Sequence, residues 1–149
     1  MLEVRGTAEF ELMAKLVSPS GLISNTNCVR EDRVLNIEGS DSSNRTFVRF
    51  INTTSDDMGA ITGTLYDIDG NMIGSANQTL LDSLAAKAQT WITRETFASI
   101  FGTEWNGEAM LEVNAGDDGL RLLNLNFVNN ETFFNFSCFE DSDSGRIFL

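Results

Sequence analysis

The stretch that decides the fold is residues 45–77, RTFVRFINTTSDDMGAITGTLYDIDGNMIGSAN. Residues 46–52 are rich in aromatic and β-branched side chains, which suit a half-buried pleated strand. Residues 59–67 alternate between apolar and polar side chains, which is the period of a second strand. Asp69-Gly70 then provides a pair that tolerates the backbone angles of a hairpin turn, and residues 71–77 return as a third strand. The stretch therefore predicts three consecutive strands.

The same alternation continues on both sides of this stretch. Further strands are expected at residues 8–17, 33–38, 87–93, 108–115, 119–129 and 133–139. Residues 21–32 show no period and are interpreted as a loop, whereas the sequence GDDG at 116–119 is interpreted as a second hairpin turn.

Three of the expected strands have recognisable faces. In residues 108–115 the side chains expected to point inward are Ala109, Leu111 and Val113. Those expected to point outward are Glu108, Met110 and Glu112. In residues 119–129 the two opposed sets are Leu123, Leu125 and Phe127 against Leu122, Asn124 and Asn126. In the last strand one inward face is expected to hold Phe134, Phe136 and Cys138.

One short helix is expected between the strands. Thr93 is a good N-cap residue, Glu95 complements the helix dipole in the first turn, and Gly102 can end the helix. Three apolar residues form a single stripe along residues 94–101. Because a two-turn helix needs tertiary packing, we expect it to close one end of a sandwich.

Short strands at intervals of about ten residues, separated by Gly, Asp and Asn turns, indicate an all-β fold. We expect one domain, residues 1–149, built as an antiparallel β-sandwich of the immunoglobulin/fibronectin-like or jelly-roll-like kind with one short α-helix. Residues 1–44 would hold N-terminal strands and the Cys28 loop, residues 45–139 the core, and residues 140–149 an acidic tail.

The chain is strongly acidic, with 10 Lys and Arg against 22 Asp and Glu, no histidine and a formal net charge of −12. Like-charge repulsion argues against nucleic acid and anionic membrane surfaces as partners, and the lack of a long apolar run argues against a membrane span. The absence of histidine removes the commonest general base. Glu108 and Glu112 would lie about 13 Å apart along a strand, too far for paired-carboxylate hydrolysis. We therefore expect no enzyme and no cofactor.

Two sets of residues suggest ligand chemistry, and each also has a structural explanation. Asp67, Asp69 and Asn71 alternate as calcium ligands do, but the glycine and the last acidic ligand of an EF-hand loop are misplaced. A hairpin turn is therefore expected there rather than a metal site.

The second set is aromatic. Trp105, Trp91 and Tyr66 could stack on a sugar, although aromatic residues more often pack in a core. Trp105 lies between two glycines and is expected to be the better exposed of the two tryptophans.

Five motifs carry a resemblance to a known family. In chain order they are FVRFINTT (47–54), GAITGTLYDIDGNMIG (59–74), W-I-T-x-x-x-F-x-x-I-F-G (91–102), WNGEAMLEV (105–113) and GLRLLNLNF (119–127). This pattern resembles a module of bacterial secreted and cell-surface proteins, found alone or appended to extracellular domains such as trypsin-like proteases. The resemblance covers residues 45–138, implies export and a sandwich, and brings no catalytic residues.

These observations lead to one leading hypothesis and one alternative. The leading hypothesis is a non-catalytic extracellular module, structural or protein-binding, that is secreted, periplasmic or on the cell surface. The alternative is a carbohydrate-binding module that uses exposed aromatic side chains. The expected partner is an unidentified protein or glycan.

The two cysteines, Cys28 and Cys138, are too far apart in sequence for a CxxC motif, so they form either two buried thiols or one disulfide. In an exported domain the disulfide is the expected state, because an oxidising environment preserves it. A bond from the Cys28 loop to the last strand would fasten both ends of the domain.

We predict that Cys28 and Cys138 are bonded to each other. Thiol titration of the unfolded, non-reduced protein should find no free sulfhydryl, and the same titration after reduction should find both. Two reactive thiols before reduction would contradict the bond and weaken the argument for export.

Overall fold

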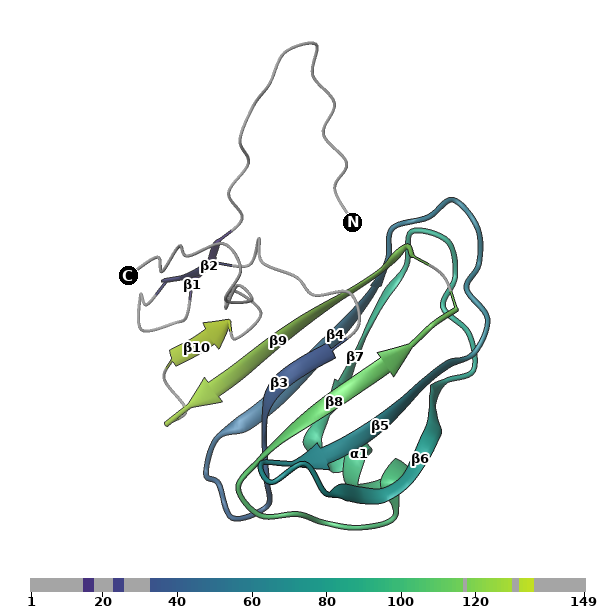
Figure 1. The fold of residues 1–149 in the computed structure, drawn as a ribbon. Helices are drawn as coiled ribbons and strands as arrows, with labels where there is room; N and C mark the ends of the chain where they lie inside the picture. The colour runs from purple at the N-terminus through teal and green to yellow at the C-terminus, as the bar shows by residue number, and fades with distance from the viewer. Residues whose placement is uncertain (1–14, 18–22, 26–32, 117, 130–131, 136–149) are drawn as a thin grey trace, which may run out of the picture.

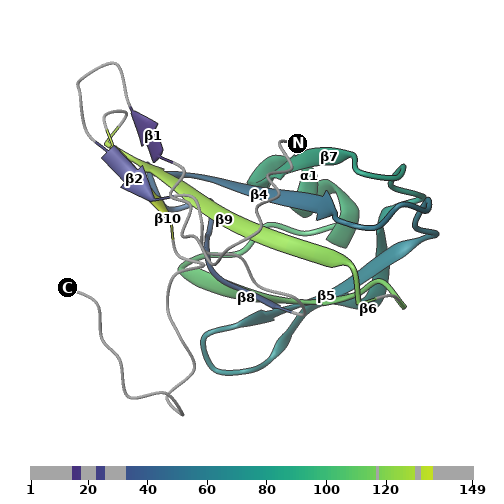
Figure 2. The same ribbon diagram turned by 90° about the horizontal axis from the view of Figure 1, so that it is seen from above.

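The computed structural model describes residues 15–17, 23–25, 33–116, 118–129 and 132–135. Two four-stranded antiparallel sheets pack face to face (Figures 1 and 2). In spatial order, the β4 sheet contains β10 (Thr132–Asn135), β9 (Leu120–Val128), β4 (Arg45–Asn52) and β7 (Gln89–Thr93). The β5 sheet contains β3 (Arg33–Glu38), β8 (Glu108–Asn114), β5 (Ile61–Asp67) and β6 (Met72–Leu81). The predicted all-β sandwich is confirmed.

A small antiparallel hairpin pairs β1 (Lys15–Val17) with β2 (Ile23–Asn25), and β2 contacts β10 at the edge of the β4 sheet. β2 lies inside residues 21–32, where the sequence predicted a loop, so that prediction is wrong. A strand of three residues is too short to show a period, which is why the alternation did not reveal it. The predicted Cys28–Cys138 disulfide lies outside the described residues.

The core lies between the two sheets. Alternation in β4 turns Thr46, Val48, Phe50 and Asn52 inward, and each is buried. In β8 the predicted inward set, Ala109, Leu111 and Val113, is confirmed. The largest fully buried apolar side chains are Phe50, Phe97, Ile37, Ile61, Leu65, Leu111 and Leu122.

The helix α1 (Arg94–Phe101) has the predicted bounds. Its N-cap Thr93 accepts a hydrogen bond from the backbone N–H of Thr96, and Gly102 ends it in the left-handed conformation at φ 70°. The helix contacts the edge strands β6 and β7, one from each sheet, and therefore closes the sandwich on the side where these strands lie (Figure 1). A Cβ on Gly74 of β6 would lie 2.4 Å from the Phe101 carbonyl oxygen, so only glycine permits this approach.

One connection differs from the sequence prediction. The turn at 116–119 is not a hairpin turn, because β8 and β9 belong to different sheets and the turn carries the chain across the sandwich. Likewise β4 lies in one sheet, whereas β5 and β6 pair as a hairpin in the other. A Gly- and Asp-rich turn can form a hairpin within one sheet or carry the chain to the other sheet. Only the burial of the flanking strands decides between these two kinds of connection.

The inward face of β9 is partly polar. Leu122, Asn124 and Asn126 point into the sandwich, where the amide nitrogens of Asn124 and Asn126 donate to the Asn36 carbonyl oxygen of β3 at 3.3 and 2.9 Å. Asn36 has φ 57°, and the β3–β8 register shifts at this point, so a bulge turns its carbonyl toward β9. The opposite face of β9 carries Leu123, which is also buried.

Among the described strands of the β4 sheet, β10 lies at the edge and pairs with β9, and β2 also contacts it. Phe134 lies opposite Asn126 and so belongs to the inward side of the sheet, yet 49% of it is exposed. The expectation that Phe134 packs among core aromatics is therefore wrong. The reason is positional, because an edge strand has a neighbour on one side only.

Asn52 connects two loops at the other end of β4, the one after β4 and the one after β6. Its amide nitrogen donates to the carbonyl oxygens of Asp56, Leu84 and Ala85 at 2.8, 3.0 and 3.1 Å, and its side-chain oxygen accepts from the backbone N–H of Thr54 at 2.8 Å. The Asn52 side chain is fully buried, as is its bond to Leu84, whereas its bonds to Asp56, Ala85 and Thr54 are partly buried.

We predict that Asn52→Ala lowers the free energy of unfolding by about 3 kcal/mol, because it leaves the buried Leu84 carbonyl and three partly buried backbone groups without their partner. Urea denaturation at neutral pH measures this change. Asn106→Ala is the control, because Asn106 is exposed and should change stability by less than about 0.5 kcal/mol. Equal effects of the two substitutions would contradict the role assigned to Asn52.

Candidate functional site

The three aromatic residues singled out from the sequence do not form one platform. Tyr66 points outward from β5, and Trp91 points outward from β7 in the opposite sheet, with 44% of its surface exposed. Trp105 is only 6% exposed, and its indole nitrogen donates to the Ile37 carbonyl oxygen at 3.4 Å.

The prediction that Trp105 is the better exposed aromatic residue is therefore wrong. The loop around it packs closely on the chain after β3: the backbone N–H of Ser40 donates to the Trp105 carbonyl oxygen at 2.8 Å, and that of Gly39 to the Gly107 carbonyl oxygen at 2.7 Å. The two glycines that flank Trp105 in sequence, Gly102 and Gly107, both have positive φ, so they serve the turns of the chain rather than exposure of the indole.

A shallow groove crosses the outer face of the β5 sheet beside Tyr66. It consists of two adjoining hollows of about 290 and 350 Å³, and both are lined by Tyr66 and Met110. We call it the Tyr66 groove; its other principal lining residues are Arg33, Asp67, Ile68, Glu108 and Glu112. The side chains come from β3, from β8, and from β5 with its following turn.

The pleat of β8 supplies one side of this groove. Glu108 and Glu112 are exposed and Met110 is half-buried between them, so the predicted outward set of this strand is confirmed. The neighbouring strand β5 brings Tyr66 opposite Met110 in the register of the sheet. The floor of the groove is thus aromatic and thioether, and its rim is carboxylate.

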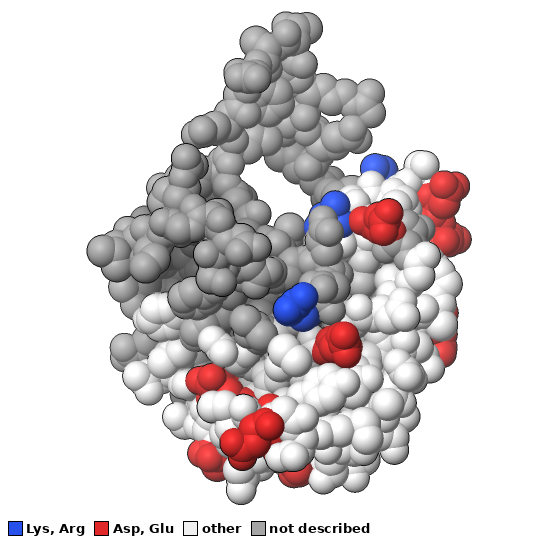
Figure 3. Space-filling model, viewed as in Figure 1, with Lys and Arg blue, Asp and Glu red and all other residues white. Residues whose placement is uncertain are grey.

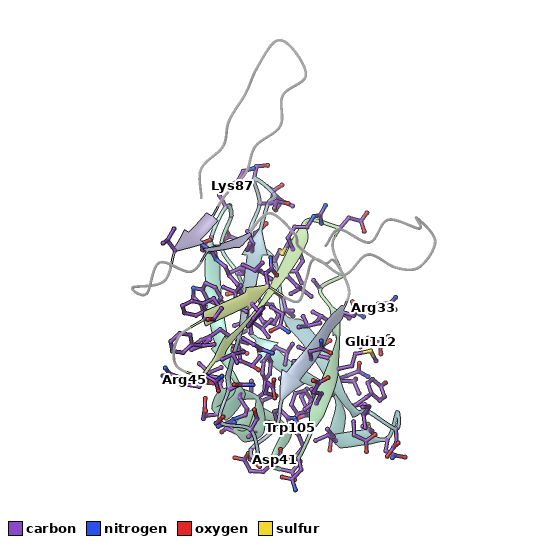
Figure 4. The ribbon with its side chains drawn as sticks, turned by 90° about the vertical axis from the view of Figure 1, so that its left-hand side faces the viewer. Arg33, Asp41, Arg45, Lys87, Trp105 and Glu112 are labelled. Atoms are coloured by element: carbon purple, nitrogen blue, oxygen red, sulfur yellow. The ribbon has the colours of Figure 1, made fainter. Side chains whose placement is uncertain are left out.

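The charge of the groove is negative. Asp67, Glu108 and Glu112 contribute three carboxylates against the one guanidinium of Arg33. Arg33 is the register partner of Glu112, and Figure 4 shows the two side by side. The Tyr66 hydroxyl donates to Glu112 Oε2 at 3.4 Å. Figure 3 faces this sheet and shows more acidic than basic side chains on it.

The turn after β5 holds the residues considered as calcium ligands. The Asp67 side chain accepts hydrogen bonds from the backbone N–H groups of Asp69 and Asn71 at 3.0 and 2.8 Å, and from the Asn71 amide at 3.1 Å. Gly70, at φ 81°, closes a three-residue hairpin loop. The predicted hairpin is confirmed, and the Asp67 carboxylate is occupied in building it.

Among the residues that the structure describes, no three side chains of the metal-binding types cluster together. The hydrogen bonds to Asp67 nevertheless have an electrostatic consequence. The Asn71 side chain, followed by the Asn71 backbone, holds the pKa of Asp67 below its ordinary value. The carboxylate therefore favours the folded turn in its charged form.

A second surface lies on the outer face of the β4 sheet and contains Trp91. We call it the Arg–Trp face; it consists of Arg45, Phe47, Arg49, Gln89 and Trp91. The Arg49 guanidinium lies over the Trp91 ring at 5.1 Å and donates to Gln89 Oε1, and the Arg45 guanidinium lies over the Phe127 ring at 5.0 Å. Burial lowers the pKa of Arg49.

Sequence reasoning missed Arg33, Ile68 and Met110 as groove residues and missed the arginines beside Trp91. The alternation of β8 placed Met110 correctly with Glu108 and Glu112, but nothing local shows that β8 pairs with both β3 and β5. The sequence did contain one signal of a surface site, which was an apolar Met110 between two acidic residues on the outward face of β8.

Comparison of the chain with protein-family models, curated proteins and solved structures finds no match in any of the three. The resemblance to the bacterial secreted module stays a prediction. Within the described part of the chain, no helix has the length and apolar character needed to span a bilayer.

We predict that the effect of Asp67→Ala on stability depends on pH. Because the folded-state pKa is depressed, the carboxylate stabilises the fold above the ordinary aspartate pKa of about 4, and this contribution is lost as pH falls through the lower folded value. The loss of stability caused by Asp67→Ala should be largest at neutral pH and should shrink on acidification.

Urea denaturation of wild type and variant between about pH 7 and pH 2.5 tests this. Asp69→Ala is the matched control, since the Asp69 carboxylate accepts none of the hydrogen bonds described for the turn. A difference between wild type and Asp67→Ala that is constant across this range would contradict the prediction.

Proposed function

We propose that this chain is a non-catalytic protein-interaction module that acts outside the cell and binds its partner through the Tyr66 groove. The observation that carries the proposal is the groove itself, where Tyr66, Met110 and exposed Ile68 lie together within a rim of carboxylates. Protein interfaces combine an apolar anchor with a polar rim in this way.

The shape of the groove favours a protein partner over a catalytic role. Its hollows of about 290 and 350 Å³ are open and adjoin along the sheet, which suits a side chain or a short extended segment of a partner. Ile68, at 83% exposed, and Met72, at 51%, extend the apolar surface around the hairpin turn. Binding would bury this area.

A carbohydrate-binding module is the second candidate, and one observation favours it. Tyr66 is flanked by the planar polar side chains of Arg33 and Glu112, which could hydrogen-bond sugar hydroxyls while the ring stacks on the sugar face.

The proposal also includes export, with the protein secreted, in the periplasm or on the cell surface. The family resemblance and the predicted disulfide support this part of it.

We predict that the purified protein selects peptides from a displayed library, and that Tyr66→Ala weakens their binding by at least about tenfold, as expected for a central aromatic anchor. Glu112→Gln should weaken binding too, whereas Glu104→Gln, which removes an exposed carboxylate outside the groove, should not.

A glycan array probed with the same protein separates the two candidates. Glycan binding that is lost in Tyr66→Ala, without peptide selection, would replace the leading proposal with the carbohydrate-binding alternative. Peptide binding that survives Tyr66→Ala unchanged would contradict the groove as the site.

A further inference from the structure

The two sheets carry opposite charge. The four strands of the β4 sheet contain three arginines, Arg45, Arg49 and Arg121, and no acidic residue. The four strands of the β5 sheet contain the single cation Arg33 and four carboxylates, those of Glu38, Asp67, Glu108 and Glu112. In a chain of net charge −12, the strands of one sheet are thus purely basic in their charged residues and those of the other mainly acidic.

The charged residues of the two outer faces also have the same spacing. Arg45 and Arg49 are four residues apart on one face of β4, with Phe47 between them. Glu108 and Glu112 are four residues apart on one face of β8, with Met110 between them. At about 3.3 Å per residue each pair spans about 13 Å along its strand. An Arg-Phe-Arg row therefore matches a Glu-Met-Glu row in length and in charge.

The arginines are held in position for such a contact. Each guanidinium lies over an aromatic ring, Arg45 over Phe127 and Arg49 over Trp91, which limits its motion. Arg49 Nε is already buried and has no hydrogen-bond partner among the described residues. Part of the desolvation free energy of this cation is therefore already spent when the monomer folds. A carboxylate placed beside the poorly solvated guanidinium would form a stronger charge pair than one in water.

We propose that the Arg–Trp face of one copy of this chain binds the Tyr66 groove of the next copy, with Arg45 and Arg49 facing Glu108 and Glu112 and with Phe47 facing Met110. The proposal rests on the proposed function, since it names the partner of the groove. An aromatic ring against a methionine sulfur is a favourable apolar centre for two charge pairs.

The contact has a consequence for assembly. The two surfaces lie on opposite sheets, and Figure 4 shows Arg45 on one side of the sandwich and Glu112 on the other. A contact between different surfaces is heterologous, so a dimer still presents one free surface of each kind. Association should continue beyond the dimer into an open chain of copies.

Sedimentation velocity of the wild-type protein over about 10 to 500 μM at low salt is the first measurement. We expect the mean mass to rise with concentration past that of a dimer, and to fall when salt is raised to about 1 M, where the Debye length is about 3 Å. A wild-type protein that stays monomeric across this range would overturn the proposal, as would a closed dimer that does not grow.

Two double variants identify the surfaces. Arg45→Glu with Arg49→Glu removes the basic surface, and Glu108→Lys with Glu112→Lys removes the acidic one; each variant alone should be monomeric. Their equimolar mixture should associate again, because the intact basic surface of one variant faces the intact acidic surface of the other and the two reversed surfaces are complementary as well. A mixture that remains monomeric, or variants that associate like wild type, would overturn the assignment.

Asp82→Lys with Glu104→Lys is the matched control for Glu108→Lys with Glu112→Lys, because it makes the same change in net charge at exposed residues outside both surfaces and should leave self-association intact. Thermal melts verify that each variant is folded, and Arg45→Gln with Arg49→Gln replaces the charge reversal if that variant does not fold. A monomeric protein that still binds library peptides through Tyr66 would overturn the self-association while leaving the proposed function in place.

Discussion

β4 and β8 are inner strands of the two sheets, and each has to bury one face of its pleat against the opposite sheet. Because side chains alternate along a strand, this burial fixes what the other face presents. Phe50 and Val48 enter the core, so Arg49 faces outward; Leu111 enters the core, so Met110 and Glu112 face outward. The two surfaces to which we assign binding are thus consequences of core packing.

The interior is closed by hydrogen bonds as well as by apolar contact. At one end of the sandwich Asn126 spans from β9 to the Asn36 carbonyl of β3, and at the other end Asn52 holds the loops after β4 and β6. Burying an amide is costly unless it is paired, and a paired amide accepts only one arrangement of its neighbours. The amide nitrogens of Asn126 and Asn52 therefore tie β9 to β3 and the loop after β4 to the loop after β6.

The charges of this acidic chain are distributed unevenly between the two sheets, which the composition alone does not show. Carboxylates gather around the Tyr66 groove and in the loops, whereas the β4 sheet carries cations stacked on aromatic rings. The field of the whole molecule remains negative and keeps copies apart at long range. In the contact that we propose between copies, the local complementarity of the two faces should outweigh this repulsion, because screening by salt confines charge interactions to about 10 Å.

Local sequence determined the elements of this protein, and tertiary structure decided how they combine. The period of two in residues 108–115, the caps Thr93 and Gly102 of the helix, and the Asp69-Gly70 hairpin were all readable, because each depends on backbone geometry within a few residues.

Local sequence did not reveal which sheet each strand joins. It also did not reveal that Trp105 is buried and Phe134 exposed, since both depend on neighbours far away in the chain. The Tyr66 groove belongs to the same class. Its residues were visible as outward positions of β5 and β8, but only the pairing of β8 with both β3 and β5 brings Arg33, Tyr66 and Glu112 together. The pairing of β8 with β3 and β5 depends on the whole core, because all three strands bury their inward side chains against the opposite sheet.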